Sequence, residues 1–478
     1  MAIRSSNSVG LMKSHVVRHR LLLLVVVVLV LGVADNYIKI VDSESNSIIN
    51  SLPGFPGNLP FKLETGYVGV GEEEEIQLFY YFIESERSPE EDPLVLWLTG
   101  GPGCSAFSGL VYEIGPLLFD YEQSNRNSTT LQFNPYSWTK VSNIIFLDAP
   151  VGTGFSYAMS WEAYQNNDIL AATTNYNFLR KWLMTHPKFL KNPLYIAGDS
   201  YSGLIVPIVA QEIDKGNDEV GVEPKMNLKG YVIGNPRTNA HDDSNSKVEF
   251  SYRKALISDQ LYESAKTNCN GEYVDVDEEN TLCKKDLQVH SECTANLSIA
   301  HILEPRCDVV QSPKPRGLHA WALITEDYFL DDDLLLSASD QPSSSMCRDY
   351  HYIYSKVWAN NQTVQNALQI REGSIKEWVR CNYSVALNYK FNVSSSIPYH
   401  QNLINKGYRV LIYSGDQDSM VPYVATQKWI AALNLTVAHA WAPWFVNEQV
   451  AGYTVHYSDK KYELTYATIK ARNLITMH

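Results

Sequence analysis

The chain has 478 residues, 45% of them apolar and 19% charged, which is too much hydrophobe and too little charge for a disordered protein. Its 39 Lys and Arg against 53 Asp and Glu give a net charge of −14, so the basic surface that nucleic-acid binding needs is missing. No apolar run of about 18 residues interrupts the body of the chain, which excludes a multi-span membrane protein. We therefore expect an acidic globular protein with a sizeable core.

The N-terminal 34 residues have the layout of a secretory signal peptide. The apolar run Leu21–Val33 is preceded by the basic residues Arg4, Lys13, Arg18 and Arg20. Small residues follow up to Ala34, where we expect cleavage. A signal anchor is the alternative, but the run is short for a hydrocarbon core of about 30 Å. The expected location is the secretory pathway, ending outside the cell or in a vacuole.

Sequons and cysteines agree with an oxidising lumen. Six Asn-x-Ser/Thr sequons begin at Asn127, Asn296, Asn361, Asn382, Asn392 and Asn434. The seven Cys include no Cys-x-x-Cys, so we expect disulfides with one thiol left over and no zinc ribbon or thioredoxin site. The residues by themselves leave the connectivity open.

Short apolar runs that end in Gly, Asp or Pro predict buried strands leading into functional loops. In chain order they are Leu94–Leu98, Ile144–Leu147, Leu194–Ala197, Tyr231–Ile233 and Val410–Tyr413. Between the second and third strands, a helix ending at His186-Pro187 is predicted by an apolar stripe of Ile169, Ala172, Tyr176, Leu179 and Leu183. A second helical stretch runs from Leu204 towards Lys215. This alternation predicts an α/β fold with a largely parallel sheet.

Residues 238–350 break the alternation. They hold five of the seven Cys, the acidic run Asp331–Asp333, and Pro-rich and Ser-rich stretches. We predict a cap inserted over the sheet, with an exposed linker near 310–346, and a separate second domain is the alternative. The core then consists of two parts, 35–237 and 351–478.

The strongest chemical signal is the segment Gly198–Gly203, Gly-Asp-Ser-Tyr-Ser-Gly, between a predicted strand and a predicted helix. A Ser on such a tight turn exposes its Oγ, and the next N–H points at a developing oxyanion. The match to Gly-x-Ser-x-Gly is imperfect, because Ser202 stands where the last Gly belongs. A plain helix start is the structural alternative.

Two other loops suit such a site. Trp97–Cys104, Trp-Leu-Thr-Gly-Gly-Pro-Gly-Cys, ends another strand, and its bare backbone N–H groups are candidates for the second oxyanion donor. A tight turn is the alternative for its glycines. Ser414–Asp418, Ser-Gly-Asp-Gln-Asp, ends the last predicted strand, where a hydrolase sheet presents its acid. A turn or helix cap is the alternative for either Asp.

These motifs, together with Asp148–Tyr157 (Asp-Ala-Pro-Val-Gly-Thr-Gly-Phe-Ser-Tyr), resemble the serine carboxypeptidase family, and most closely its plant branch of serine carboxypeptidase-like acyltransferases. The resemblance covers essentially the whole mature chain. It implies an α/β-hydrolase fold, a largely parallel central sheet flanked by helices, with an inserted helical cap. It also implies Ser200 as nucleophile, Asp418 as triad acid, and the N–H groups of Gly101 and Tyr201 as oxyanion hole.

The same resemblance implies which cysteines form disulfides, and it implies no metal or cofactor. It pairs Cys104 with Cys381 and Cys307 with Cys347. It pairs Cys269 with Cys283 or Cys293, a choice that the sequence leaves open. No metal, no cofactor and no nucleic-acid partner are implied, and the oligomeric state is not addressed.

The pocket beside the nucleophile separates two reactions. Family peptidases resemble one another in an Asn and a Glu where this chain has Thr99 and Asp199, while Glu113 matches a third pocket position. Asp is one methylene shorter than Glu, and Thr has no amide N–H, so these residues favour the acyltransferase branch. That branch moves a hydroxycinnamoyl or galloyl group from a 1-O-glucose ester to an alcohol through a serine acyl-enzyme. A carboxypeptidase is the alternative.

The base of the triad has no match. The family places its His in Gly-Gly-Gly-His-Thr-Ala-Pro-Glu after a strand that resembles Tyr466–Lys470, and Leu474 stands at the matching position. His439 and His456 occur in other segments, and His478 is four residues late. We expect that the His-bearing segment is missing and that the chain is nearly inactive. A catalytically dead isoform or secreted binding protein is the third reading.

Overall fold

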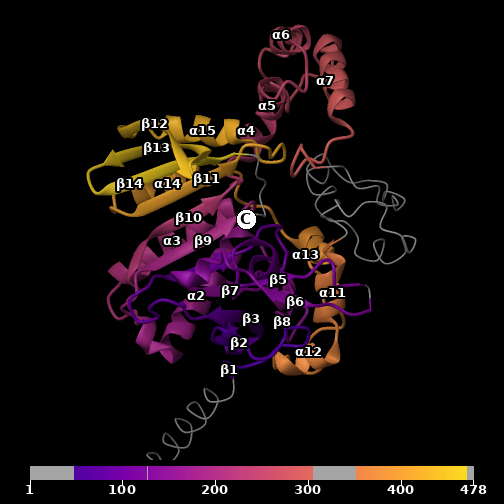
Figure 1. Cartoon of the computed structure of the whole chain (residues 1–478). Coiled ribbons are helices and arrows are strands. Elements are labelled where there is room, and N and C mark those ends of the chain that lie inside the picture. The colour runs from indigo at the N-terminus through magenta and orange to yellow at the C-terminus, as the bar shows by residue number, and fades with distance from the viewer. Residues whose placement is uncertain (1–47, 126, 305–350, 471–478) are drawn as a thin grey trace, which may run out of the picture. The chain divides into compact units, whose positions relative to one another are not determined.

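The computed structural model describes residues 48–125, 127–304 and 351–470 (Figure 1). Residues Ile49–His478 form one unit by their contacts. Several predictions concern residues outside the described ranges and stay predictions: the signal peptide, the linker near 310–346, Cys307, Cys347, Leu474 and His478.

The strands form one large mixed sheet and a small two-stranded one. They are β1 (Ile48–Ile49), β2 (Leu63–Val70), β3 (Ile76–Ile83), β4 (Leu94–Leu98), β5 (Leu117–Phe119), β6 (Leu131–Phe133), β7 (Asn143–Leu147), β8 (Tyr157–Ala158), β9 (Leu194–Asp199), β10 (Leu228–Gly234), β11 (Arg409–Gly415), β12 (Thr436–Val446), β13 (Gln449–Asp459) and β14 (Tyr462–Ile469). In the large sheet the order runs β2-β3-β7-β4-β9-β10-β11-β14-β13-β12, and β5 pairs with β6 in the small one.

The centre of the large sheet is parallel, and both edges are antiparallel. Parallel pairing runs from β7 through β4, β9, β10 and β11 to β14. Antiparallel pairs join β2 to β3, β3 to β7, β14 to β13 and β13 to β12. All five strands predicted from apolar runs lie in the parallel centre, which confirms the predicted fold class. The antiparallel edges were not predicted, because several edge strands are half-exposed and do not read as continuous apolar runs.

Helices flank the sheet. They are α2 (Asp168–Thr185), α3 (Ser202–Asp218), α4 (Ala240–Asn245), α5 (Lys247–Arg253), α6 (Asp259–Asn268), α7 (Thr281–Thr294), α11 (Ile353–Ala359), α12 (Gln362–Ala367), α13 (Tyr383–Asn388), α14 (Ile397–Ile404) and α15 (Tyr423–Ala432), with short turns of other helix types at η1 (Glu72–Glu74), η2 (Gly109–Glu113), η3 (Trp138–Lys140), η4 (Glu162–Tyr164) and η5 (Pro187–Phe189). None of the described helices is long and apolar enough to cross a membrane.

The helix predicted before His186-Pro187 is α2. Its N-cap is Asn167, whose side chain accepts the N–H of Leu170, and its C-cap is His186. Its buried face includes Phe178 and Trp182. Ile169 of the predicted stripe is 41% exposed, so the stripe was wrong at its first position.

Hydrophobic clusters fill both faces of the sheet. On one face, α2, α3 and α14 contribute to a cluster that includes Trp182. On the other face, Phe107 stacks on Trp358 with ring centroids 4.9 Å apart, and Trp97 and Trp378 belong to the same cluster. Residues that follow the predicted cap therefore pack into the core of the sheet. The predicted domain boundaries themselves stay predictions.

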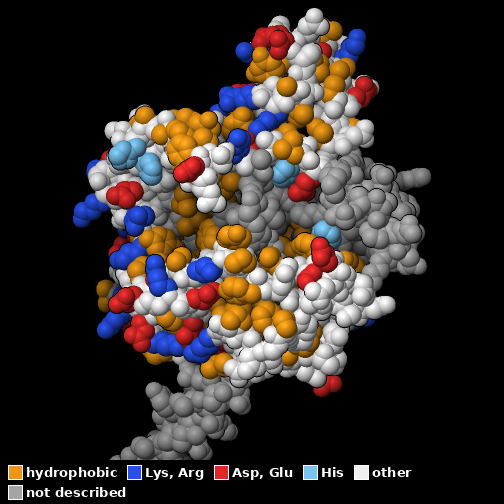
Figure 2. Space-filling view, in the orientation of Figure 1, with side chains coloured by type: hydrophobic (Ala, Val, Ile, Leu, Met, Phe, Trp, Pro, Cys, Tyr) orange, Lys and Arg blue, Asp and Glu red, His pale blue; other side chains and the backbone are white. Residues whose placement is uncertain are grey.

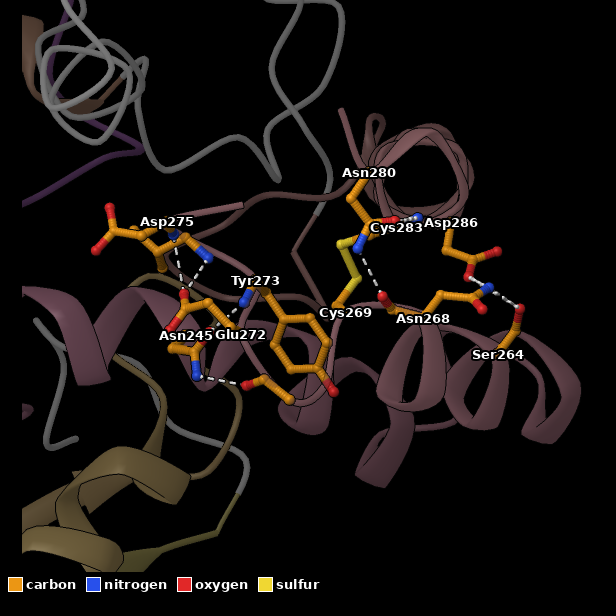
Figure 3. Close-up of a disulfide and its surroundings, with 12 residues drawn as sticks. Asn245, Ser264, Asn268, Cys269, Glu272, Tyr273, Asp275, Asn280, Cys283 and Asp286 are labelled. Atoms are coloured by element: carbon orange, nitrogen blue, oxygen red, sulfur yellow. Dashed lines mark hydrogen bonds between the residues drawn. A yellow bond between two sulfur atoms is a disulfide. The ribbon is translucent and has the colours of Figure 1, made fainter. Parts of the chain in front are cut away.

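Between β10 and β11 the regular elements of the described residues are helices, joined by loops. Helices α6 and α7 lie side by side beyond α5 (Figure 1) and share a small separate cluster around Val248, Ile257 and Ala265. A disulfide between Cys269 and Cys283 ties the end of α6 to α7 (Figure 3). This settles the choice that the sequence left open.

The second described disulfide, Cys104–Cys381, confirms a predicted pair and joins the loop after β4 to the segment before α13. Among the described residues, Cys293 is the free thiol and is exposed.

The β12–β13 hairpin carries apolar side chains at the surface. Figure 2 shows hydrophobic side chains gathered over it, and the exposed large ones are Val437, Trp441, Phe445, Val446 and Tyr453.

Candidate active site

Ser200 lies on the turn between β9 and α3, as predicted. Its φ is 55°, a left-handed conformation that is costly for a residue with a side chain. Three backbone hydrogen bonds hold it there: its N–H donates to the carbonyl of Gly234 (2.9 Å), and its carbonyl accepts from Gly203 (3.0 Å) and Arg237 (2.9 Å). The strand-to-helix turn therefore fixes a strained serine next to the loop after β10.

Glycines allow three chain segments to meet around Ser200. A Cβ on Gly100 would lie 2.6 Å from the Ser200 Cβ and 3.1 Å from its Oγ. A Cβ on Gly203 would lie 2.5 Å from the Cβ of Pro236. The close approach that needs a glycine thus falls on Gly203, which explains why Ser202 is tolerated where the motif expects a Gly.

The two backbone N–H groups predicted to bind an oxyanion are available. Neither the N–H of Gly101 nor that of Tyr201 donates a hydrogen bond within the described part of the chain. Asp148 anchors the segment that follows the Gly101 loop. Its carboxylate accepts hydrogen bonds from the Ser105 hydroxyl (2.6 Å) and the Ala106 N–H (2.8 Å). An oxyanion hole needs two such N–H groups without a protein acceptor, and their role in one stays a prediction.

Asp418 is fully buried in the loop after β11. Its Oδ1 accepts the N–H groups of Met420 (2.7 Å) and Val421 (3.0 Å), and its Oδ2 accepts the side-chain amide of Asn235 (2.8 Å). Burial raises the pKa of Asp418 to about 7, against the lowering effect of these bonds. Asn235 directly follows Gly234, the partner of the Ser200 N–H, so one loop connects the predicted nucleophile and acid.

Asp416, the other acid of this motif, points elsewhere. Its carboxylate is 3.3 Å from the ammonium of Lys254. The structure therefore separates the two acids that the sequence placed side by side.

Two of the predicted pocket residues contact the indole of Trp97, and the third contacts the backbone nearby. Its Nε1–H donates to Glu113 Oε2 (3.1 Å) and to Thr99 Oγ1 (3.2 Å). Asp199 Oδ1 accepts the N–H of Gly100 at 3.1 Å. Thr99, Glu113 and Asp199 thus come together from the loop after β4, from η2 and from the end of β9.

Glu113 and Asp199 form a coupled pair of buried acids. Burial raises the pKa of Asp199 to about 7. Burial, and then the charge of Asp199, raise the pKa of Glu113 well above its usual range. Asp199 therefore takes up a proton as the pH falls through about 7, which changes its carboxyl group from an acceptor only to a donor and acceptor.

His456 and His439 do not lie at the site. His456 pairs with Thr465 in the sheet and its Nδ1 is 2.9 Å from the Thr465 hydroxyl. The site end of β14 is Ile469, four residues further, or about 13 Å along the strand. His439 faces His456 in the β12–β13 pair, so neither ring reaches the end of β11.

A histidine that the sequence did not single out lies closer to the acid loop. The Ile302 N–H donates to the carbonyl of Gln417 (3.0 Å), and the Ile299 carbonyl accepts from Ser419 (2.9 Å) and Met420 (3.1 Å). His301 lies in this segment and is 8% exposed. These hydrogen bonds join residues 299–302, which precede the predicted linker, to the loop that carries Asp418. The two segments are far apart in the sequence, so only the folded chain shows that they meet.

No group of three or more His, Cys, Asp or Glu suited to hold a metal ion occurs among the described residues.

Known proteins resemble this chain in sequence and fold. The serine carboxypeptidase family model matches residues 53–472. Serine carboxypeptidase-like 1 of Arabidopsis thaliana is 49% identical over 89% of this chain and 88% of its own length. Serine carboxypeptidase-like 13 of the same plant is 46% identical over 90% of each chain. The crystal structure of Kex1(delta)p, a prohormone-processing carboxypeptidase from Saccharomyces cerevisiae, superposes with a TM-score of 0.67 over 89% of this chain and 91% of that one, at 18% identity.

Proposed function

The chain belongs to the serine carboxypeptidase family, a family of serine-type enzymes, and on that premise we propose that it transfers an acyl group from a 1-O-glucose ester to an alcohol through Ser200. The observation that carries the proposal is the strained Ser200 beside two available N–H groups and a pocket of buried acids. The acyl group proposed is of the hydroxycinnamoyl or galloyl type.

The reaction is a double displacement. The Ser200 Oγ attacks the ester carbonyl, and the developing oxyanion accepts hydrogen bonds from the N–H groups of Gly101 and Tyr201. Glucose leaves with a proton, and an acceptor alcohol then attacks the acyl-enzyme in the same geometry. A base must take the proton from the attacking hydroxyl in each half.

The acid pair suits a sugar in both of its protonation states. A sugar hydroxyl donates to an ionised carboxylate and accepts from a protonated carboxyl group, so glucose can bind Glu113 and Asp199 across the pH range. A peptide's terminal carboxylate only accepts, so it needs the protonated pair. We therefore propose the glucose ester as the substrate near neutral pH.

The same acid pair is also the specific observation behind a second candidate, a carboxypeptidase. Below the pKa of about 7 of Asp199, protonated carboxyl groups would donate hydrogen bonds to the C-terminal carboxylate of a peptide. This activity would fall as the pH rises through neutrality, whereas glucose-ester turnover would not lose its donor contacts.

We also propose that this chain catalyses acyl transfer only slowly, because Leu474 stands at the position of the family's catalytic His. Loss of a triad member typically lowers the rate by orders of magnitude, to roughly 10³–10⁴ over water. The His-bearing variant replaces residues 471–478 with Gly-Gly-Gly-His-Thr-Ala-Pro-Glu and supplies the imidazole. If the natural chain is already fast, His301 is the first residue to test as its base.

The test measures kcat/KM of both proteins, each with and without Ser200→Ala, at pH 5 and 7.5. The substrates are a 1-O-hydroxycinnamoyl glucose with an alcohol acceptor and an N-blocked dipeptide. We expect Ser200-dependent turnover to rise by orders of magnitude in the His-bearing variant, with the glucose ester preferred at pH 7.5. Preference for the dipeptide at both pH values would establish the carboxypeptidase instead. Absence of Ser200-dependent turnover in both proteins would overturn both candidates.

A further inference from the structure

Arg237 contacts the nucleophile turn through its backbone and places its guanidinium near the ring of Tyr201, the residue after Ser200. Its backbone N–H donates to the Ser200 carbonyl at 2.9 Å, which fixes the start of its side chain. The guanidinium carbon lies 5.9 Å from the centre of the Tyr201 ring. The residue is half-buried, so its charge is partly removed from water.

Within the described ranges this guanidinium has neither an ion pair nor a side-chain hydrogen bond. Burial raises the pKa of the nearby acid Asp243 and the charge of Arg237 opposes that rise, but the buried Oδ1 of Asp243 makes no hydrogen bond to the guanidinium. Asp243 Oδ2 accepts the N–H groups of Thr238 (2.9 Å) and Asn239 (3.1 Å). Asp168 accepts the Tyr201 hydroxyl at 2.5 Å. A partly buried cation with five N–H donors and no protein acceptor is unusual, because desolvation without compensation is costly.

Aromatic rings surround the same place. The Tyr201 ring packs edge-on against Tyr389 at 6.1 Å and Phe391 at 5.7 Å. Phe391 is 38% exposed and so presents part of its ring to solvent. Together these residues combine flat apolar surface with a hydrogen-bond donor, next to the residue that carries the acyl group.

The contacts of this region differ from those of the acid pair. Glu113 and Asp199 contact Trp97 and Gly100, which precede the oxyanion loop. Arg237 contacts Tyr201, which follows the nucleophile. A substrate that spans Ser200 would then meet acids at one end and a cation at the other.

We propose that Arg237 selects the acyl group, by donating hydrogen bonds to an oxygen at its far end. The inference rests on the proposed function and names the chemistry of its acyl half: a planar aromatic group with an oxygen acceptor opposite the carbonyl. A phenolic hydroxyl and a carboxylate both supply such an oxygen, and the carboxylate would pair more strongly.

Binding measurements test the inference without relying on turnover. The probes are the 1-O-glucose esters of cinnamic, 4-hydroxycinnamic and 4-carboxycinnamic acid, which differ only at the far end of the acyl group. Their Kd values are measured by calorimetry on the full-length chain with Ser200→Ala, alone and combined with Arg237→Leu or Arg237→Lys. The matched control is Arg180→Leu, because that guanidinium lies 5.8 Å from the Tyr176 ring on α2 in a similar arrangement.

We expect the Kd values of the oxygen-bearing esters to be at least about tenfold lower than that of the cinnamoyl ester. A hydrogen bond to a charged donor contributes a binding free energy of this order. Arg237→Leu should abolish the difference, Arg237→Lys should retain part of it, and Arg180→Leu should leave it unchanged. The ratio of the 4-hydroxy to the 4-carboxy ester shows which oxygen is preferred.

The two hypotheses fail in different ways. If all three esters bind but Arg237→Leu keeps their ratio, the role of Arg237 is wrong and the glucose-ester proposal stands. If none of the esters binds to a chain that melts cooperatively, the donor class is wrong and the role of Arg237 falls with it.

Discussion

The side-chain amide of Asn235 donates a 2.8 Å hydrogen bond to Oδ2 of Asp418, and both side chains are fully buried. The Asn235 Oδ1 accepts the N–H of Gly415 at 3.0 Å, so the amide bridges the ends of β10 and β11. Only an amide supplies both a donor and an acceptor in this shape. Asn235 is therefore a positioning residue for the predicted acid.

Replacing Asn235 with Asp should test this bridge. The new carboxyl keeps the acceptor for Gly415 but places an oxygen against Asp418, so one of the two acids must stay protonated. We expect a loss of roughly 1–3 kcal/mol in the free energy of unfolding, larger at pH 8 than at pH 5.

Thermal melting at the two pH values measures the effect. Asn245→Asp is the matched control, because Asn245 also bridges two backbone groups, the Gly271 carbonyl (2.9 Å) and the Tyr273 N–H (2.6 Å), with no acid as its hydrogen-bond partner (Figure 3). Equal, pH-independent losses in both variants would contradict the assignment.

Gly100→Ala should damage the nucleophile more than the fold. The new Cβ would lie 2.6 Å from the Ser200 Cβ, and displacing a reacting group by about 1 Å can cost about 100-fold in rate. In the His-bearing variant we expect kcat/KM to fall by about this factor. Gly66→Ala is the control, since its Cβ would meet the Tyr80 hydroxyl at 3.1 Å away from the site. Comparable rate losses in both would contradict a local effect at Ser200.

Asp243 should make the fold less stable as the pH rises. Burial raises its folded-state pKa from 3.8 to about 7, so the folded chain binds a proton that the unfolded chain releases. Its stabilising contribution is present below the unfolded pKa and is lost as the pH rises to about 7. Relative to the natural chain, Asp243→Asn should gain up to about 1.4 kcal/mol per pH unit between about 4 and 7, and nothing more above.

Urea unfolding from pH 4 to 8 measures this difference. The buried His400 has a pKa lowered to about 3 and acts in the opposite sense, but it is present in both proteins and cancels. A constant difference across the range would show that the carboxyl of Asp243 titrates normally.

The Cys269–Cys283 disulfide should stabilise the α6–α7 pair locally. It closes a loop of 14 residues, for which constraint of the unfolded chain is worth about 3 kcal/mol. The cluster that it supports is small and separate from the sheet. Replacing both residues with Ser should accelerate hydrogen exchange in α6 and α7 and leave β9–β11 protected. Cys293→Ser should change neither region, and loss of protection throughout the sheet would contradict local unfolding.

Glycosylation in a secretory host should skip one sequon. The Asn382 Nδ2 donates to the Gly152 carbonyl at 2.8 Å, and the side chain is half-buried. Asn127, Asn296, Asn361, Asn392 and Asn434 are exposed. Mass spectrometry should find glycans at several of these five and none at Asn382, together with an N-terminus after cleavage near Ala34. An intact Met1 and unmodified Asn peptides would contradict passage through the secretory pathway.

The elements of the fold that the sequence predicted are those set by local chemistry. Buried parallel strands need continuous apolar runs, and Leu94–Leu98 and Val410–Tyr413 have them. The turn at Ser200 needs small residues around it, which the segment Gly198–Gly203 supplies. The triad acid and the predicted pocket residues followed from a resemblance of motifs, and the contacts of Asp418 are compatible with its role.

Only the tertiary structure decided which side chains meet across the chain. Asn235 and Asp418 are 183 positions apart, and Gly100 and Asp199 are 99 apart. Parallel strands connected by long crossovers bring such residues to one edge of a sheet, and no local pattern records the register. The choice of Cys283 as the partner of Cys269 depends on the same long-range packing, as does the guanidinium of Arg237, which has no acceptor among the described residues. The sequence by itself therefore determined the five central strands, the nucleophile turn and the resemblance to the family, and the folded chain determined the electrostatic surroundings in which they act.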